Sequence, residues 1–174
     1  MTSHSPLLRR YGLAFISFCV LVLSPMGVWG QETGIPFSEY YSPKKYDAGT
    51  QNWVITQDVL GRMYFGNGSG VLTYNGSGWE LLQTGKGSTV RGLDADSLGR
   101  VYVAAKGDFG YLEANKIGKL AFVSLQDQIT DAATQALLLK SGEASQVLYT
   151  SHGTYYDFEN CLVRWNGKEV QAFP

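Results

Sequence analysis

Two stretches of the chain, residues 58–66 and 96–104, show the same alternation of hydrophobic and polar positions. They read DVLGRMYFG and DSLGRVYVA and lie 38 residues apart. In both stretches Asp-x-x-Gly is followed by apolar residues at alternate positions. This pattern is typical of a tight turn that leads into a strand. The spacing predicts one structural unit that is repeated along the chain. The turn residues expected to have a structural role are Asp58, Gly61, Asp96 and Gly99.

The alternation predicts four short strands in each unit. In the first unit they are residues 53–57, 62–66, 71–74 and 79–82, and in the second 90–95, 100–105, 109–113 and 119–124. A third, looser unit is predicted to have strands at residues 134–139, 146–150, 162–165 and 170–173. In this unit residues 151–160 are expected to form a long inserted loop, and Asn166-Gly167 a two-residue hairpin turn.

Four strands in about 40 residues are typical of a β-propeller blade. The predicted fold class is therefore all-β, a partial β-propeller of about three four-stranded antiparallel blades at residues 51–83, 88–125 and 133–174. A β-sandwich is the alternative, although sandwiches rarely repeat strand by strand. Because a closed propeller has about 4 to 8 blades, the open faces are expected to be covered by other blades or by a partner protein.

The first thirty residues have a different pattern. Arg9 and Arg10 precede a mainly apolar stretch of twelve residues, Gly12 to Leu23, and Gly27 and Gly30 are among the residues that follow before Gln31. This pattern predicts a cleaved signal peptide at residues 1–30, and the apolar stretch is short for a membrane span of about 20 residues. We expect the mature chain to be exported to the periplasm or cell surface without a membrane span, and residues 31–50 to be an extended segment.

Several short motifs occur along residues 34–112. They are GIPF (34–37), YSPKKY (41–46), QNWVITQD (51–58), GRMYFGN (61–67), GVLTYNG (70–76), Trp79 and GDFGYL (107–112). Together these motifs resemble the N-terminal part of the bacterial two-component regulator propeller family, whose sensors are typical of Bacteroidetes. The resemblance covers most of residues 34–125. It implies an extracytoplasmic sensor, in some members for oligosaccharides, usually followed by a triple-tyrosine domain, a membrane helix and a kinase or transcription-factor output. The chain as given contains none of these later parts.

Composition narrows the possible functions. A composition of 44% hydrophobic and 17% charged residues indicates a globular protein rather than a disordered one. Loss of residues 1–30 would change the net charge from −1 to −3, and this acidic balance without a basic run disfavours nucleic-acid binding. The glycines at residues 66–70 are followed by β-rich residues rather than a helix, so they predict a turn instead of a nucleotide loop.

Catalytic and metal-binding signals are weak. Cys161, the only cysteine after residue 30, is expected to be a buried hydrophobic residue, and Asp94 with Asp96 is a poor metal motif because Asp96 begins a repeated turn. His152 lies in sequence beside Ser151 and ahead of Asp157, but sequence proximity does not make a catalytic triad. We expect no enzyme activity, no cofactor and no metal.

The remaining hypothesis is a sensor that binds a ligand. Aromatic rings stack on sugar faces and also pack between blades. The residues expected to face an oligosaccharide or another small extracellular ligand are Trp53, Arg91, Asp94, Tyr155 and Tyr156. An exported propeller enzyme of the lyase or glycosidase type and a protein-interaction scaffold are the alternatives.

Overall fold

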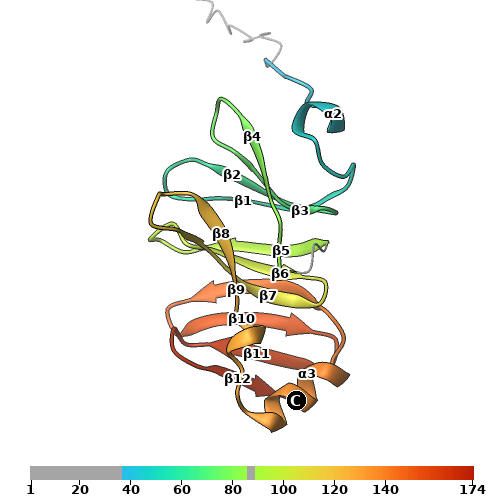
Figure 1. The fold of residues 1–174 in the computed structure, drawn as a ribbon, viewed down its shortest axis with the longest axis vertical. Coiled ribbons are helices and arrows are strands. Elements are labelled where there is room, and N and C mark those ends of the chain that lie inside the picture. Colours follow the sequence, from blue (N-terminus) through green and yellow to red (C-terminus); the bar gives the residue numbers. More distant parts are fainter. Residues whose placement is uncertain (1–36, 86–88) are drawn as a thin grey trace, which may run out of the picture. The chain divides into compact units, whose positions relative to one another are not determined.

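The computed structural model describes residues 37–85 and 89–174, and these form an all-β fold. The chain divides into two units, Met1–Glu39 and Tyr40–Pro174. In the first unit only residues 37–39 are described, without regular secondary structure, and the expected signal peptide lies outside the described residues. The second unit contains three four-stranded antiparallel sheets (Figure 1).

Each sheet is built from four consecutive strands that pair in sequence order. The first sheet has β1 (Asn52–Gln57), β2 (Met63–Asn67), β3 (Gly70–Tyr74) and β4 (Trp79–Leu82). The second has β5 (Val90–Ala95), β6 (Val101–Ala105), β7 (Asp108–Ala114) and β8 (Leu120–Ser124). The third has β9 (Ala144–Thr150), β10 (Gly153–Phe158), β11 (Cys161–Trp165) and β12 (Val170–Phe173). The helical segments are α2 (Pro43–Tyr46), η1 (Gln126–Gln128) and α3 (Ala132–Lys140).

The repeated Asp-x-x-Gly turn connects the first two strands in both the first and the second sheet. Asp58 accepts hydrogen bonds from the backbone N–H groups two and four residues later, and its second oxygen accepts one from the Tyr64 hydroxyl at 2.9 Å. Asp96 makes the same three bonds, with the Tyr102 hydroxyl at 3.0 Å. These bonds hold the turn in shape, and positive φ values occur at its two glycines, Gly61 and Gly99.

A β-bulge recurs at the same position of the first strand in all three sheets. The pairing skips one residue between Asn52 and Val54, one between Val90 and Gly92, and one between Ala144 and Gln146. The extra residues, Trp53, Arg91 and Ser145, are therefore structural equivalents. The third sheet keeps the ladder of the other two although its sequence is less similar to theirs.

The sequence prediction is wrong at two elements of the third unit. Residues 134–139 lie in helix α3 rather than in a strand, because the segment is rich in Ala and Leu and Asp131 caps it by accepting a bond from the Thr134 N–H at 2.7 Å. The expected loop at residues 151–160 contains strand β10, in which Thr154, Tyr156 and Phe158 are buried and the residues between them are more exposed.

Two shorter segments also differ from expectation. The β11–β12 turn has four residues, 166–169, and not two, because the side-chain oxygen of Asn166 accepts bonds from the N–H groups of Lys168 and Glu169. In the segment expected to be extended, α2 forms one helical turn that ends at Asp47, where φ is 51°. In residues 37–85 and 89–174 we find no helix of the length and apolarity that a membrane crossing requires.

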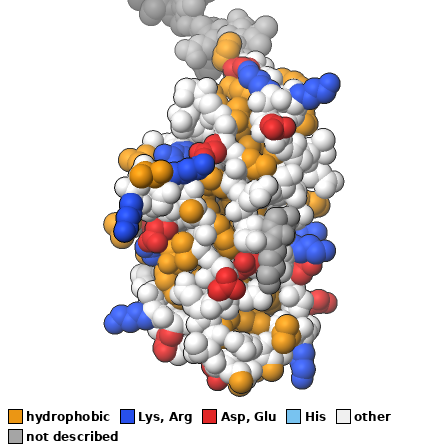
Figure 2. Space-filling model, viewed as in Figure 1, with side chains coloured by type: hydrophobic (Ala, Val, Ile, Leu, Met, Phe, Trp, Pro, Cys, Tyr) orange, Lys and Arg blue, Asp and Glu red, His pale blue; other side chains and the backbone are white. Residues whose placement is uncertain are grey.

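Both faces of every sheet carry hydrophobic side chains. We call the face of a sheet that looks toward the preceding sheet in the sequence its front face, and the opposite one its back face. The back face of the first sheet packs on the front face of the second, and the back face of the second on the front face of the third. Some hydrophobic side chains also reach the surface between charged groups (Figure 2).

The backbones approach most closely where the first strands β1, β5 and β9 lie against one another. A Cβ atom on Gly92 would lie 2.8 Å from the Cα atom of Gln146 on β9. A Cβ atom on Gly66 would lie 2.9 Å from the carbonyl oxygen of Val90 on β5. Since real Cβ atoms do not come this close to backbone atoms, glycine sets the distance between neighbouring sheets at these points.

We expect Gly92→Ala to lower the free energy of unfolding by about 1–3 kcal/mol, because the methyl group would push the second and third sheets apart. Denaturant unfolding measures this change. The control is Gly78→Ala, at a turn glycine with no atom within 4 Å of its would-be Cβ and no positive φ, which should change the stability far less. Equal effects of the two variants would contradict the close packing.

The Tyr64 hydroxyl gives a prediction at alkaline pH. Burial, and then its bond to Asp58, raise its pKa from 10.0 to about 12, so the folded state holds this proton more tightly than the unfolded state does. The stabilisation is complete below pH 10.0 and is lost as the pH rises toward about 12. The stability advantage of the wild type over Tyr64→Phe should therefore shrink across this range in denaturant unfolding.

Candidate functional site

The residues predicted to bind a ligand do not form one site. Trp53 and Arg91, the equivalent bulge residues of β1 and β5, do meet, with the guanidinium carbon 4.8 Å from the centre of the indole ring. Asp94 instead joins two sheets, because one carboxylate oxygen accepts a 2.7 Å bond from the Tyr149 N–H on β9. This oxygen is thus used in a contact between sheets.

Tyr155 and Tyr156 lie on β10, so the loop position expected for them is wrong. Their side chains point to opposite faces of the sheet, as neighbours on a strand must. Tyr156 has no exposed surface, and its hydroxyl donates a 2.7 Å bond to the Gly110 carbonyl. Burial raises its pKa well above 10.0. Tyr155 is partly exposed on the back face of the third sheet.

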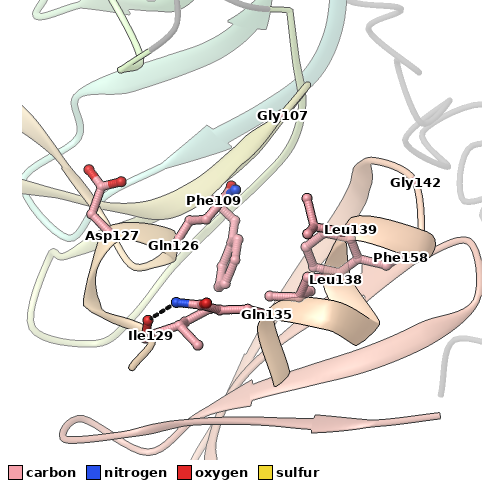
Figure 3. A pocket seen from close by; sticks show the side chains of 10 residues that line it. All are labelled: Gly107, Phe109, Gln126, Asp127, Ile129, Gln135, Leu138, Leu139, Gly142 and Phe158. Carbon is pink, nitrogen blue, oxygen red and sulfur yellow. Dashed lines mark hydrogen bonds between the residues drawn. The ribbon is translucent and has the colours of Figure 1, made fainter. Parts of the chain in front are cut away.

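A cavity of about 520 Å³ lies beside helix α3 (Figure 3). Residues 125–143 connect the second sheet to the third, and they are a much longer connection than residues 83–89, which connect the first to the second. The extra length supplies η1 and α3, which form one side of the cavity. The residues that line it are Gly107, Phe109, Gln126, Asp127, Ile129, Gln135, Leu138, Leu139, Gly142 and Phe158.

The α3 cavity combines an apolar floor with polar groups. The Phe109 ring points into it, and Phe158 contacts that ring edge-on, with the ring centres 5.4 Å apart (Figure 3). Gln135 is held by a 2.6 Å bond from its amide nitrogen to the Ile129 carbonyl, which fixes the direction of its amide group. Apolar side chains beside amide groups suit a neutral ligand that has an apolar face and hydroxyl groups, such as a sugar.

Helix α3 is firmly positioned. Leu138 belongs to the buried core between the second and third sheets, and the Ser141 hydroxyl donates a 2.7 Å bond to the Leu137 carbonyl near the end of the helix. At the other end, two hydrogen bonds from Thr134 lower the pKa of the capping Asp131. The sequence did not predict this site, because a strand was expected at residues 134–139. The capping Asp131 followed by Ala- and Leu-rich sequence was the signal that could have revealed the helix.

An aromatic cluster surrounds Trp79 on the front face of the first sheet. The rings of Tyr41, Tyr46, Phe65 and Tyr74 lie 4.7–5.5 Å from the Trp79 ring, between centres. A second cavity, of about 590 Å³, is lined by these five residues and Tyr40, Pro43, Thr50 and Asn52. The Trp79 indole N–H is buried and has no hydrogen-bond partner. Neither cavity is lined by any of the five residues predicted to bind a ligand.

Of Ser151, His152 and Asp157, only the first two side chains are in contact. The Ser151 hydroxyl lies 3.1 Å from Nδ1 of His152 in the exposed β9–β10 turn, while the Asp157 carboxylate is contacted by Ser145. Cys161 is buried, as expected. In the two described ranges no three His, Cys, Asp or Glu side chains are grouped so that they could hold a metal ion.

Comparison with known proteins adds no relative. No family model matches the chain, and no curated protein was found to be similar to it. The arrangement of the described residues therefore carries the functional argument.

Proposed function

We propose that the three sheets are blades of a β-propeller and that residues 1–30 are a signal peptide. The blade assignment is supported by the strand order, by the bulge common to all three sheets and by the turn shared by the first two. It is also supported by the contact between successive first strands, since the first strands of propeller blades surround the central axis.

The function we propose is that of an exported, non-enzymatic module that binds a small ligand. The α3 cavity is the observation that carries this proposal. It lies beside the core between two sheets, and an insertion absent from the first connection supplies one of its sides. Loops held by a rigid sheet scaffold are common positions for binding sites.

We further propose that the ligand is an oligosaccharide and that the module belongs to a two-component-type sensor. The apolar face of a sugar ring would lie toward Leu138, Leu139 and Phe158, since Phe109 is only 1% exposed, and its hydroxyl groups would meet Gln126, Asp127 and Gln135. The sequence motifs of residues 34–125 support the sensor assignment by resemblance alone.

Filling the cavity should block binding. A glycan array would first identify the bound sugar. Calorimetry would then compare the affinity of the wild type for this sugar with that of Leu139→Trp, at an exposed residue that lines the cavity. We expect at least about tenfold weaker binding, because the indole would occupy the space of the ligand. Leu98→Trp, at an exposed turn residue outside the cavity, is the matched control and should bind as the wild type does. Unchanged binding by Leu139→Trp would contradict this site, and an array without any bound sugar would contradict the ligand class.

Export can be tested independently. When the full chain is expressed in a Gram-negative host, N-terminal sequencing of the periplasmic protein should give Gln31 as the first residue, because signal peptidase cleaves after small residues. Blocking the cleavage site with Gly30→Pro should leave the longer form attached to the membrane fraction. A periplasmic product that still begins at residue 1 would contradict the proposal.

A further inference from the structure

In the described part of the chain, the front face of the first sheet is covered by the segment that contains helix α2 and not by another sheet. The rings of Tyr41 and Tyr46 from this segment lie 5.1 and 5.5 Å from the Trp79 ring on β4, between centres. The segment is anchored at Gly49, whose N–H donates a 3.0 Å bond to the side-chain oxygen of Asn67. The Gly49 carbonyl accepts a 2.7 Å bond from the amide nitrogen of the same asparagine. Ring packing and hydrogen bonds thus hold this segment on the sheet.

This cover is smaller than a sheet, and it leaves a cavity. Phe65 is equivalent to Val103 of the second sheet. Tyr74 is equivalent to Leu112. The two residues of the second sheet are at most 3% exposed, because the first sheet packs on them, whereas Phe65 and Tyr74 remain partly exposed although their rings are larger. The cavity of about 590 Å³ between the α2 segment and the sheet, which we call the Trp79 cavity, is the space that this short segment does not fill.

The lining of the Trp79 cavity is mainly aromatic, and none of the described residues in it carries a charge. Three of its four tyrosine hydroxyls are engaged. The Tyr41 and Tyr74 hydroxyls lie 3.1 Å apart, and the Tyr74 hydroxyl also donates a 3.0 Å bond to the Gly76 carbonyl. The Tyr46 hydroxyl donates to the Gly49 carbonyl at 3.4 Å. A sugar would bring more hydroxyl groups than such a lining can bond, so the cavity suits a neutral ring with few polar atoms.

One polar group of the cavity lacks an acceptor. The Trp79 indole N–H is buried, and no atom of the described residues accepts a hydrogen bond from it. A buried donor of this kind is destabilising, and a ligand oxygen that accepts from it would remove the penalty. Because the N–H is buried, a neighbouring ring must turn aside before a ligand can reach it, and the cavity gives that ring room to move.

We propose that the Trp79 cavity binds a small neutral aromatic compound with an oxygen acceptor, such as a phenol. The ring of this compound would pack edge-on or offset against Phe65 and Tyr74, the arrangements that aromatic pairs prefer. Its oxygen would accept the hydrogen bond of the Trp79 N–H. The Trp79 cavity shares no lining residue with the α3 cavity, and the proposal does not depend on sugar binding there.

The test titrates the protein, purified after expression of the full chain, with p-cresol and follows the indole N–H signals by nuclear magnetic resonance. The Trp79 signal, assigned by its loss in Trp79→Phe, should move as p-cresol binds. The signal of Trp165, on the third sheet, should stay in place. Movement of the Trp79 signal with methyl glucoside and not with p-cresol would overturn the ligand class.

A comparison of p-cresol with toluene separates the hydrogen bond from ring packing, because toluene has the same ring and methyl group without the hydroxyl. Trp79→Phe keeps an aromatic ring but has no N–H. The ratio of the affinity for p-cresol to that for toluene should therefore be about three- to tenfold lower in Trp79→Phe than in the wild type. An unchanged ratio would overturn the bond to Trp79.

Filling the cavity tests its position. Thr50→Trp places an indole at an exposed residue of the lining and should weaken p-cresol binding at least about tenfold. Thr130→Trp, at an exposed residue outside the lining, is the matched control and should bind as the wild type does. Unchanged binding by Thr50→Trp, or no binding of p-cresol to the wild type, would overturn the proposal. Thr50 lies outside the aromatic cluster, so this comparison decides the question even if Trp79→Phe does not fold.

The outcome is separable from that of the sugar experiment, because the two cavities have different lining residues. Leu139→Trp should bind p-cresol as the wild type does, and Thr50→Trp should bind the sugar as the wild type does. Failure of p-cresol binding with intact sugar binding would refute the Trp79 site alone. Failure of sugar binding with intact p-cresol binding would refute the α3 site alone.

Discussion

Face-to-face packing of twisted sheets is the constraint on which the rest of this structure depends. The second sheet is apolar on both sides because a neighbouring sheet covers each of its faces, and the first strands approach until only glycine fits at Gly66 and Gly92. This explains why the repeat tolerates Val, Ala, Phe or Tyr at equivalent positions but keeps its spacing. A larger side chain on one sheet can be matched by a smaller one on the facing sheet, whereas the distance between the backbones of neighbouring first strands cannot change in this way.

The Asp-x-x-Gly turn and the bulge adapt each sheet to this packing. The aspartate ends the first strand, organises the turn and binds the hydroxyl of a tyrosine that lies in the next interface, so one residue connects local geometry to packing. The third sheet has lost this network. Thr150 takes the position of the aspartate and donates to the Gly153 carbonyl, and Tyr155, the counterpart of Tyr64 and Tyr102, lies on the face that no described sheet covers.

The proposed ligand site lies where the chain departs from the repeat. The insertion between the second and third sheets forms the α3 cavity, and the two outer sheet faces remain partly uncovered in the described residues. The first feature suits a small ligand because it is concave, with fixed polar groups.

The sequence by itself determined the strands of the first two sheets, their turns and the equivalence of the sheets, since alternation and Asp-x-x-Gly signals are local and occur twice. It did not determine that residues 132–140 form a helix or that residues 153–158 form a strand, because short apolar runs fit either structure until their neighbours are known. The cavity was equally hidden, as it joins Phe109 and Phe158 to a helix that was predicted to be a strand. Tertiary structure also decided that Asp94 links two sheets and that Tyr156 is buried, because side-chain surroundings depend on which sheet covers which face.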